Sequence, residues 1–249
     1  MKPRVYYAAE VSDALDFALD YLRKTGREVT NVPSTAVTDV LLGVPCRVSS
    51  EKLKAALATL PPAVRIFGGF LERKELQGYP CYDLLTNEAY LAKNAAITAH
   101  CAVQLAAQRL PVILADCPVL VLGWGRIGKV LTKLLKDAGA HVTVGVRSEE
   151  QRAMLDALGY TPTALPLQEY ILPQFRVIFN TIPAPVLSAE ALAHCQPGCV
   201  KLELASEDGI VGNDVLIARG LPGKIAPESS GQLIAHTVIG LNAIKEDGV

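Results

Sequence analysis

The chain has 249 residues, of which 50% are hydrophobic and 20% are charged, so it holds enough apolar side chains for a sizeable core and is not globally disordered. Its formal net charge of -1 excludes the basic surplus that nucleic-acid binding requires. The start lacks a signal-peptide core, and the most apolar stretch, Pro111 to Leu122, contains Asp116 and is too short to span a bilayer. We therefore expect a cytoplasmic protein with neither nucleic acid nor membrane as a partner.

Residues 1–85 predict a small α/β domain. Strand-like apolar runs occur at Val5–Ala9, Val40–Val44 and Arg65–Gly69, and amphipathic helices separate them. Ser12 is a candidate cap for the first helix and Gly26 its end, while Ser50 precedes the second helix. This alternation of strands and helices favours a parallel sheet.

Residues 86–110 predict one long linking helix. Small and apolar side chains recur there at three- and four-residue spacing, and Asn87 or Thr86 is a candidate cap. The alanines at this spacing are Ala89, Ala92, Ala96, Ala99 and Ala106. Because alanine is small, such a helix allows neighbouring elements to approach closely.

Residues 111–226 predict a Rossmann-type doubly wound parallel sheet, and residues 227–249 a C-terminal helix. The unbroken apolar run Pro118–Leu122 is typical of a buried parallel strand. Further strands are expected at 141–145, 160–162, 176–180 and 199–204, with helices at 129–138 and 149–158. The fold class is therefore α/β with two domains.

A glycine-rich loop follows the first of these strands and reads Gly123-Trp124-Gly125-Arg126-Ile127-Gly128. The pattern G-x-G-x-x-G between a strand and a helix is typical of dinucleotide binding. Its first glycine permits the tight turn, the second leaves room for the pyrophosphate, and the third lets helix and strand pack closely. The alternative is a strand-turn-helix that binds no ligand.

The end of the next strand bears on the choice of cofactor. It reads Val146-Arg147-Ser148, without the acidic residue that usually holds the ribose hydroxyls of NAD. A guanidinium binds phosphate through two parallel hydrogen bonds, so Arg147 and Ser148 favour NADP, and NAD remains the alternative. Glu149 and Glu150 suit the first turn of a helix, where they complement its dipole.

Further candidates follow the later strands. Ligands bind beyond the carboxyl ends of strands in open α/β sheets, so we assign Asn180-Thr181-Ile182-Pro183 to the cofactor site. An Asn-Thr turn before Pro183 is the structural alternative. Ser206 also follows a strand end, whereas Glu203 within that strand favours a structural role over catalysis.

Three polar residues near the C-terminus are candidates for substrate binding. Lys224, in a predicted turn, is a cation for a substrate carboxylate, unless it is simply solvated. Ser229 and Ser230, at a predicted helix start, offer an anion site, unless they only cap the helix. Lys224 and Ser206 are the candidate catalytic residues.

Metal binding is not expected. The six cysteines contain no C-x-x-C pair, and the four histidines lack metal-ligand spacing. Cys195 and Cys199 are the closest pair, without a second pair to complete a zinc site. Reduced thiols, mostly buried, are the expected state.

The C-terminal half resembles the A-subunit family of dipicolinate synthase, a sporulation enzyme. The resemblance rests on the glycine loop, on Asn180-Thr181-Ile182-Pro183, on Gly220-Leu221-Pro222-Gly223-Lys224-Ile225-Ala226-Pro227 and on Gly231-Gln232-Leu233-Ile234. It implies a two-domain fold related to D-2-hydroxyacid dehydrogenases, a nicotinamide cofactor, a cyclic dicarboxylate substrate and a flavoprotein-like B subunit. The chain departs from the family at Tyr7-Ala8-Ala9-Glu10 and at Glu228-Ser229-Ser230.

The first hypothesis for function is an NAD(P)-dependent oxidoreductase that acts on a dicarboxylate related to dihydrodipicolinate. A nucleotide-binding regulatory or scaffold protein without catalysis is the second. A dehydrogenase of a 2-hydroxy or amino acid is the third. We also expect a homo-oligomer such as a dimer.

Overall fold

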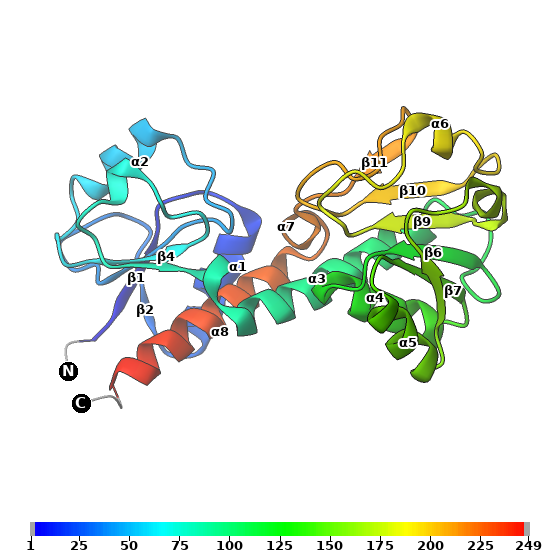
Figure 1. Cartoon of the computed structure of the whole chain (residues 1–249). Coiled ribbons are helices and arrows are strands. Elements are labelled where there is room, and N and C mark those ends of the chain that lie inside the picture. The colour runs from blue at the N-terminus through cyan, green and yellow to red at the C-terminus, as the bar shows by residue number, and fades with distance from the viewer. Residues whose placement is uncertain (1–2, 247–249) are drawn as a thin grey trace. The chain divides into compact units, whose positions relative to one another are not determined.

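The computed structural model describes residues 3–246, which form two compact units, each built on a parallel sheet (Figure 1). Unit 1 comprises the chain up to Asn94 together with the chain from Pro222 onward. Unit 2 comprises Ala95–Leu221. The predicted α/β fold class is confirmed. Within residues 3–246, none of the helices combines the length and apolar character needed to cross a membrane.

Unit 1 contains a five-stranded parallel sheet in the order β2-β1-β3-β4-β5. Its strands are β1 (Val5–Ala8), β2 (Glu28–Val29), β3 (Asp39–Leu41), β4 (Arg65–Gly68) and β5 (Cys81–Asp83). Its helices are α1 (Asp13–Lys24), α2 (Ser50–Leu57) and α8 (Pro227–Glu246), and α7 (Leu221–Ile225) begins at its boundary. The sequence indicated β1, β3 and β4, but β2 and β5 are short and lack an apolar run.

The helix ends in unit 1 follow local capping chemistry. The Ser12 side chain accepts a hydrogen bond from the Leu15 amide at 3.3 Å, and Gly26 follows the end of α1 with φ at +80°, both as predicted. For α2 the cap is one residue earlier than predicted. Ser49 accepts from the Lys52 amide at 3.3 Å, and Ser50 is the first helical residue.

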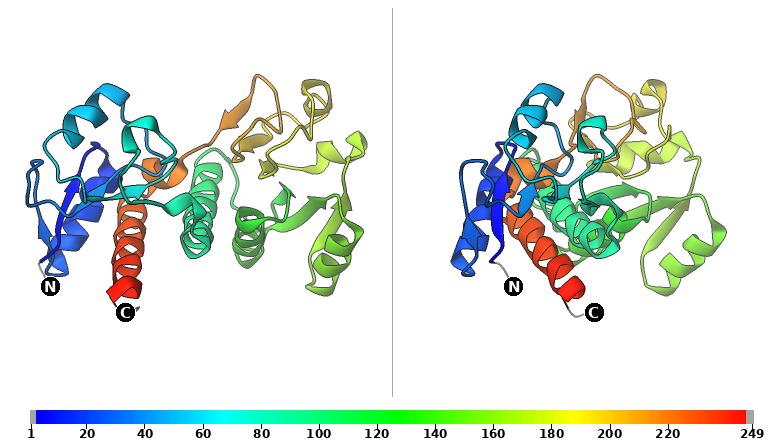
Figure 2. Two further views of the ribbon diagram at one scale, coloured as in Figure 1. Left: turned by 60° about the vertical axis from the view of Figure 1, so that its left-hand side comes forward. Right: turned by 90° about the vertical axis from the view of Figure 1, so that its left-hand side faces the viewer.

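Helix α8 packs along α1 in unit 1 (Figures 1 and 2). A Cβ on Gly231 would lie 2.3 Å from the Ala14 carbonyl oxygen, so glycine allows the two backbones to approach closely. Tyr21 and His236 also share a hydrogen bond of 2.5 Å between their side chains. The last helix, treated as a separate segment in the sequence, thus belongs to the N-terminal unit.

A buried polar network ties α8 to the sheet of unit 1. Asp39 is completely buried and forms an ion pair with Arg65. Arg65 also donates to the Asn242 side-chain oxygen at 2.7 Å, and the Asn242 amide lies 3.1 Å from the Tyr6 hydroxyl. Thr38 donates its hydroxyl to Asp39 at 2.6 Å. One buried carboxylate therefore links three strands and the last helix through hydrogen bonds.

The long linking helix is present as α3 (Glu88–Ala107), and the division between the units falls within it. The Asn87 side chain accepts a hydrogen bond from the Tyr90 amide at 2.9 Å, which confirms Asn87 as its cap.

Unit 2 contains a six-stranded parallel sheet in the order β11-β10-β9-β6-β7-β8. Its strands are β6 (Pro118–Leu122), β7 (His141–Val146), β8 (Thr161–Ala164), β9 (Val177–Asn180), β10 (Val200–Glu203) and β11 (Val215–Ile217). Its own helices are α4 (Arg126–Asp137), α5 (Glu149–Ala157) and α6 (Ala189–Leu192). The sequence predicted all of these strands except β11, which has only three residues.

Strand register determines where the connecting loops leave the sheet of unit 2. Leu122 at the end of β6 pairs with Gly145 on β7 and with Asn180 on β9. Asn180 in turn pairs with Glu203 at the end of β10. Because these strands are parallel, the loops that follow them all emerge from the same carboxyl edge.

Candidate functional site

The glycine loop runs from the end of β6 to the start of α4. Gly123 has φ at +96°, and a Cβ there would lie 2.6 Å from the Thr181 hydroxyl oxygen. A Cβ on Gly128 would lie 2.2 Å from the Gly123 carbonyl oxygen. Both glycines are therefore required by the packing and backbone of the protein itself.

Gly125 differs from the other two glycines. Its φ of -80° is accessible to any residue, and a Cβ there would meet nothing within 4 Å. The residue is also exposed. The space that Gly125 leaves open is therefore not filled by the fold, and it lies where the loop turns into α4.

The N-terminus of α4 is suited to an anion. Gly125 is the capping residue and has no side chain to accept from the first amides, and the first turn, which begins with the exposed Arg126 and the half-buried Ile127, contains no acidic residue. The free N–H groups and the positive end of the helix dipole thus face the loop. The Lys129 ammonium lies 5.0 Å from the centroid of the Trp124 ring, which adds positive charge near the loop.

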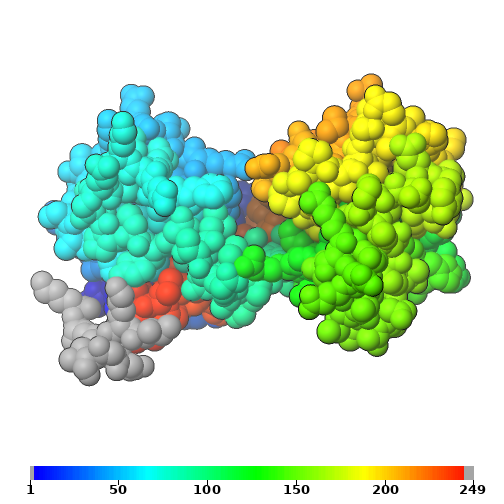
Figure 3. Space-filling model, in the orientation of Figure 1, coloured from blue at the N-terminus to red at the C-terminus, as the bar shows by residue number. Residues whose placement is uncertain are grey.

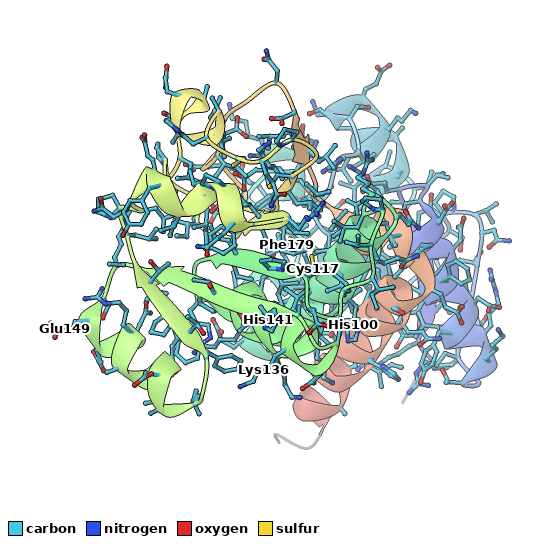
Figure 4. All side chains as sticks on the ribbon, turned by 90° about the vertical axis from the view of Figure 1, so that its right-hand side faces the viewer. His100, Cys117, Lys136, His141, Glu149 and Phe179 are labelled. Carbon is cyan, nitrogen blue, oxygen red and sulfur yellow. The ribbon has the colours of Figure 1, made fainter. Side chains whose placement is uncertain are left out.

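At the end of β7, Arg147 is exposed and Ser148 caps α5 by accepting from the Gln151 amide at 3.3 Å. Arg152, one turn into α5, donates to the Arg147 carbonyl oxygen at 2.9 Å. A second guanidinium is therefore held at this strand end. Sequence reasoning did not identify Arg152, although its signal was a basic residue one helical turn after the strand. Glu149, in the first turn of α5, extends outward in Figure 4.

The segment after β9 is held by its own hydrogen bonds. Asn180 is fully buried, and its amide contacts Glu203 and the Ile182 carbonyl oxygen. Thr181 donates its hydroxyl to the Leu122 carbonyl oxygen at 2.8 Å. These two side chains therefore shape the loop. Ile182 is half-buried, whereas Pro183 and Ser206 are exposed at this edge.

The three candidates for substrate binding belong to unit 1. Lys224 is exposed and lies in α7, so the predicted turn is in fact a short helix. Ser229 is exposed in the first turn of α8, and Ser230 is buried there. Neither serine is the residue before the helix, because α8 begins at Pro227. Lys224, Ser229 and Ser230 therefore lie outside unit 2, which contains the glycine loop and the residues at the carboxyl edge of its sheet.

The opposite edge of the sheet of unit 2 contains a cavity of about 220 Å³, lined by Lys136, His141 and Tyr160 among others. Lys136 and His141 are labelled in Figure 4. Lys136 donates to the Gly159 carbonyl oxygen at 2.6 Å and lies 4.5 Å from the centroid of the Tyr160 ring. Its charge is thus already engaged. Ligands of open α/β sheets bind at the carboxyl edge, so the glycine-loop edge is the candidate site.

No cluster of three or more His, Cys, Asp or Glu side chains within residues 3–246 is arranged to hold a metal ion. The Cys195 and Cys199 thiols instead form a hydrogen-bonded pair before β10. The hydrogen bond from Cys199, with the Lys201 charge nearby, lowers the pKa of Cys195 to about 7. The pKa of Cys81 is raised instead, because its thiol is partly shielded from water and lies near the charge of Asp83, even though the residue as a whole is exposed.

We expect iodoacetamide at pH 7 to modify Cys195 about tenfold or more faster than Cys81, because the thiolate is the reactive form. The rate at Cys195 should rise with pH through a midpoint near 7. Peptide mass spectrometry after brief labelling measures both rates. Cys199→Ala should move the midpoint upward, and equal labelling of the two cysteines would contradict the pairing.

No protein-family model matches the chain. Among curated proteins, the dipicolinate synthase A-subunit from Bacillus subtilis (strain 168) is 30% identical over 153 residues. That alignment covers 58% of this chain and 52% of the relative, so the chain matches about half the length of that relative. The resemblance that the motifs indicated is confirmed.

Solved structures extend the similarity to the whole fold. The dipicolinate synthase A-subunit from Bacillus halodurans gives a TM-score of 0.80 at 20% identity, covering 96% of this chain and 97% of that chain. A transhydrogenase from Sinorhizobium meliloti gives a TM-score of 0.71 at 17% identity, covering 96% of this chain and 83% of that chain. At these identities the matches show a shared two-sheet, Rossmann-like α/β fold.

Proposed function

We propose that the chain is an NAD(P)-dependent oxidoreductase that binds its dinucleotide at the glycine loop of unit 2. The observation that carries this proposal is Gly125. Neither packing nor backbone conformation requires a glycine at this position, whereas both require one at Gly123 and packing requires one at Gly128. A missing side chain at Gly125 leaves room for the pyrophosphate, whose charge the first amides of α4 would neutralise.

The residues at the carboxyl edge suit the rest of such a molecule. The backbone amides at the start of α4 would bind the pyrophosphate, and the ends of β9 and β10 would flank the nicotinamide half. The chemistry that a nicotinamide dinucleotide supplies when bound is hydride transfer. The protein contributes orientation and a fixed electrostatic environment at that edge.

The proposed preference is for NADP over NAD. Arg147 and Arg152 place two guanidinium groups at the end of β7, where the adenosine ribose is expected. Guanidinium groups bind phosphate strongly, and the acidic residue typical of an NAD site is replaced by Arg147.

The proposed substrate is a cyclic dicarboxylate related to dihydrodipicolinate. The name of the relative from Bacillus subtilis, which belongs to a dipicolinate synthase, supports this class. Lys224, with Ser229 and Ser230, supplies the candidate groups for a carboxylate, and Ser206 a hydroxyl beside the cofactor edge. Because that relative is named as one subunit of its enzyme, we also propose that a different protein chain is a partner.

A nucleotide titration tests the cofactor proposal. Trp124 is the single tryptophan and lies inside the glycine loop, so its emission should report binding directly. Reduced nicotinamide absorbs at the wavelengths where tryptophan emits, and we expect NADPH to quench Trp124 more tightly than NADH. Arg147→Ala should weaken NADPH binding about tenfold or more, because a charged hydrogen bond to phosphate is lost.

Arg176→Ala is the matched control, because it removes a guanidinium at the opposite edge, before β9. It should leave NADPH binding unchanged. If neither nucleotide binds the wild-type protein, the oxidoreductase and the nucleotide-binding scaffold are both excluded. If NADPH binds but dihydrodipicolinate is not turned over, the scaffold is favoured.

A further inference from the structure

Glu203, the last residue of β10, has a carboxylate that is fully buried yet fully satisfied. One oxygen accepts from the Ala205 amide at 2.8 Å, and the other from the Gly209 and Ile210 amides at 2.9 Å each. The Asn180 side chain donates to both oxygens at 2.9 Å. A buried carboxylate is tolerated only with such a set of donors, and hydrogen bonds to a charged acceptor are the strong ones.

Asn180 links this carboxylate by hydrogen bonds to the segment after β9. Its side-chain oxygen accepts from the Ile182 amide at 3.1 Å, and its nitrogen donates to the Ile182 carbonyl oxygen at 3.0 Å. Both polar groups of the Ile182 backbone are thus held by one side chain. The orientation of that side chain is set in turn by Glu203.

The segments after β9 and after β10 also contact each other directly. The Gly209 carbonyl oxygen accepts from the Val186 amide at 2.7 Å. A Cβ on Gly209 would lie 2.3 Å from the Asn180 amide nitrogen and 2.5 Å from the Ile182 carbonyl oxygen, so only glycine fits. The chain from β9 to β11, yellow to orange in Figure 3, forms adjoining parts of the surface of unit 2.

We propose that Glu203 is a positioning residue, whose carboxylate fixes residues 181–187 and 204–210 as one preformed wall for the nicotinamide half of the dinucleotide. This inference rests on the proposed function. The wall includes Thr181 and Ser206, which lie at the same carboxyl edge as the glycine loop. The adenine half binds on the other side of β6, toward β7, and does not depend on the wall.

Glu203→Gln tests the proposal with little change of volume. A glutamine places an amide group against backbone N–H donors in either orientation, so buried donors lose their acceptor. We expect NADPH binding to weaken by about tenfold or more, as is typical when buried donors are left unpaired. Binding of 2′-phospho-ADP-ribose, which lacks the nicotinamide, should change by less than about twofold.

Glu190→Gln is the matched control, because it makes the same chemical change on an exposed residue of unit 2 that lies in α6, outside the wall. It should alter neither affinity. Equal weakening of both ligands by Glu203→Gln would overturn the proposal, since it would indicate general destabilisation of unit 2. Unchanged NADPH binding would overturn it as well. Failure of the wild-type protein to bind either ligand would instead remove the proposed function on which the inference rests.

Hydrogen exchange on the wild-type protein gives a second test that does not require a folded variant. NADPH should slow exchange in peptides covering residues 181–187 and 204–210, whereas 2′-phospho-ADP-ribose should slow it only around the glycine loop and the end of β7. Equal protection of the wall by both ligands would overturn the proposal.

Discussion

Gly128→Ala is expected to destabilise unit 2 by about 3 kcal/mol, at the upper end of the cost of overpacking. The added Cβ would lie 2.2 Å from the Gly123 carbonyl oxygen, and that oxygen is part of the backbone at the end of β6. Neither group can move alone, because Gly123 is hydrogen-bonded to Gly145 through its amide at 2.9 Å. Relief therefore requires α4 to shift away from the sheet.

Gly125→Ala, in the same loop, should change stability little and weaken nucleotide binding strongly. Its Cβ meets no protein atom within 4 Å, so the loss of stability should stay within about 1 kcal/mol, the range of helix-capping effects. Nucleotide binding should weaken about tenfold or more, because the methyl group occupies the space expected for the pyrophosphate.

Urea unfolding followed by tryptophan emission measures the first effect in unit 2 alone, since Trp124 is the only tryptophan. Titration with NADPH measures the second. The variants Gly128→Ala and Gly125→Ala control for each other, because both add one methyl group to the same loop. A Gly125→Ala protein that binds NADPH normally would contradict the assigned site.

The second large effect is expected in unit 1. Arg65→Met should lower the free energy of unfolding of that unit by about 3 kcal/mol, because it removes the nearer of the two arginines that pair with the buried Asp39 carboxylate and leaves only Arg4, at 3.9 Å. The hydrogen bond from Arg65 to Asn242 is lost as well, which loosens α8 from the sheet.

Lys24→Met is the control for the loss of a charged pair in unit 1. Lys24 and Asp20 form an exposed ion pair of 2.7 Å on α1, with 72% and 45% of their side chains exposed. Its removal should cost less than about 1 kcal/mol. Hydrogen exchange of peptides from β3 and α8 measures the difference between the variants. Equal losses of stability in Arg65→Met and Lys24→Met would indicate that the buried ion pair stabilises unit 1 no more than the exposed pair does.

The features of the fold that could be predicted are those determined by residues close together in the sequence. The glycine loop, the strand before it and the Ser12 and Asn87 caps all follow from patterns within a few residues. The cap of α2 was placed one residue late because Ser49 and Ser50 are both suitable, and only the backbone conformation distinguishes them.

The parts that were not predictable depend on residues distant in sequence. The Asn180 side chain is buried and hydrogen-bonded to Glu203, which lies 23 residues later, whereas its contact with the cofactor stays a prediction. Arg152 became a candidate only when its hydrogen bond to Arg147 was seen. The role of Gly231 depends on α1, which is more than 200 residues earlier in the chain. Such contacts arise from tertiary packing, which a local pattern does not encode.

The pairing of α1 with α8 has a consequence for biosynthesis. The face of α1 that packs on α8, which includes Ala14, Phe17 and Tyr21, emerges from the ribosome early, but α8 is translated only after all of unit 2. At ordinary rates of elongation this delay is on the order of ten seconds. Unit 2 has its complete sequence by then and folds first, whereas unit 1 stays open in the nascent chain. Nascent unit 1, with this face uncovered, is therefore the stage of synthesis most exposed to aggregation and most dependent on chaperones.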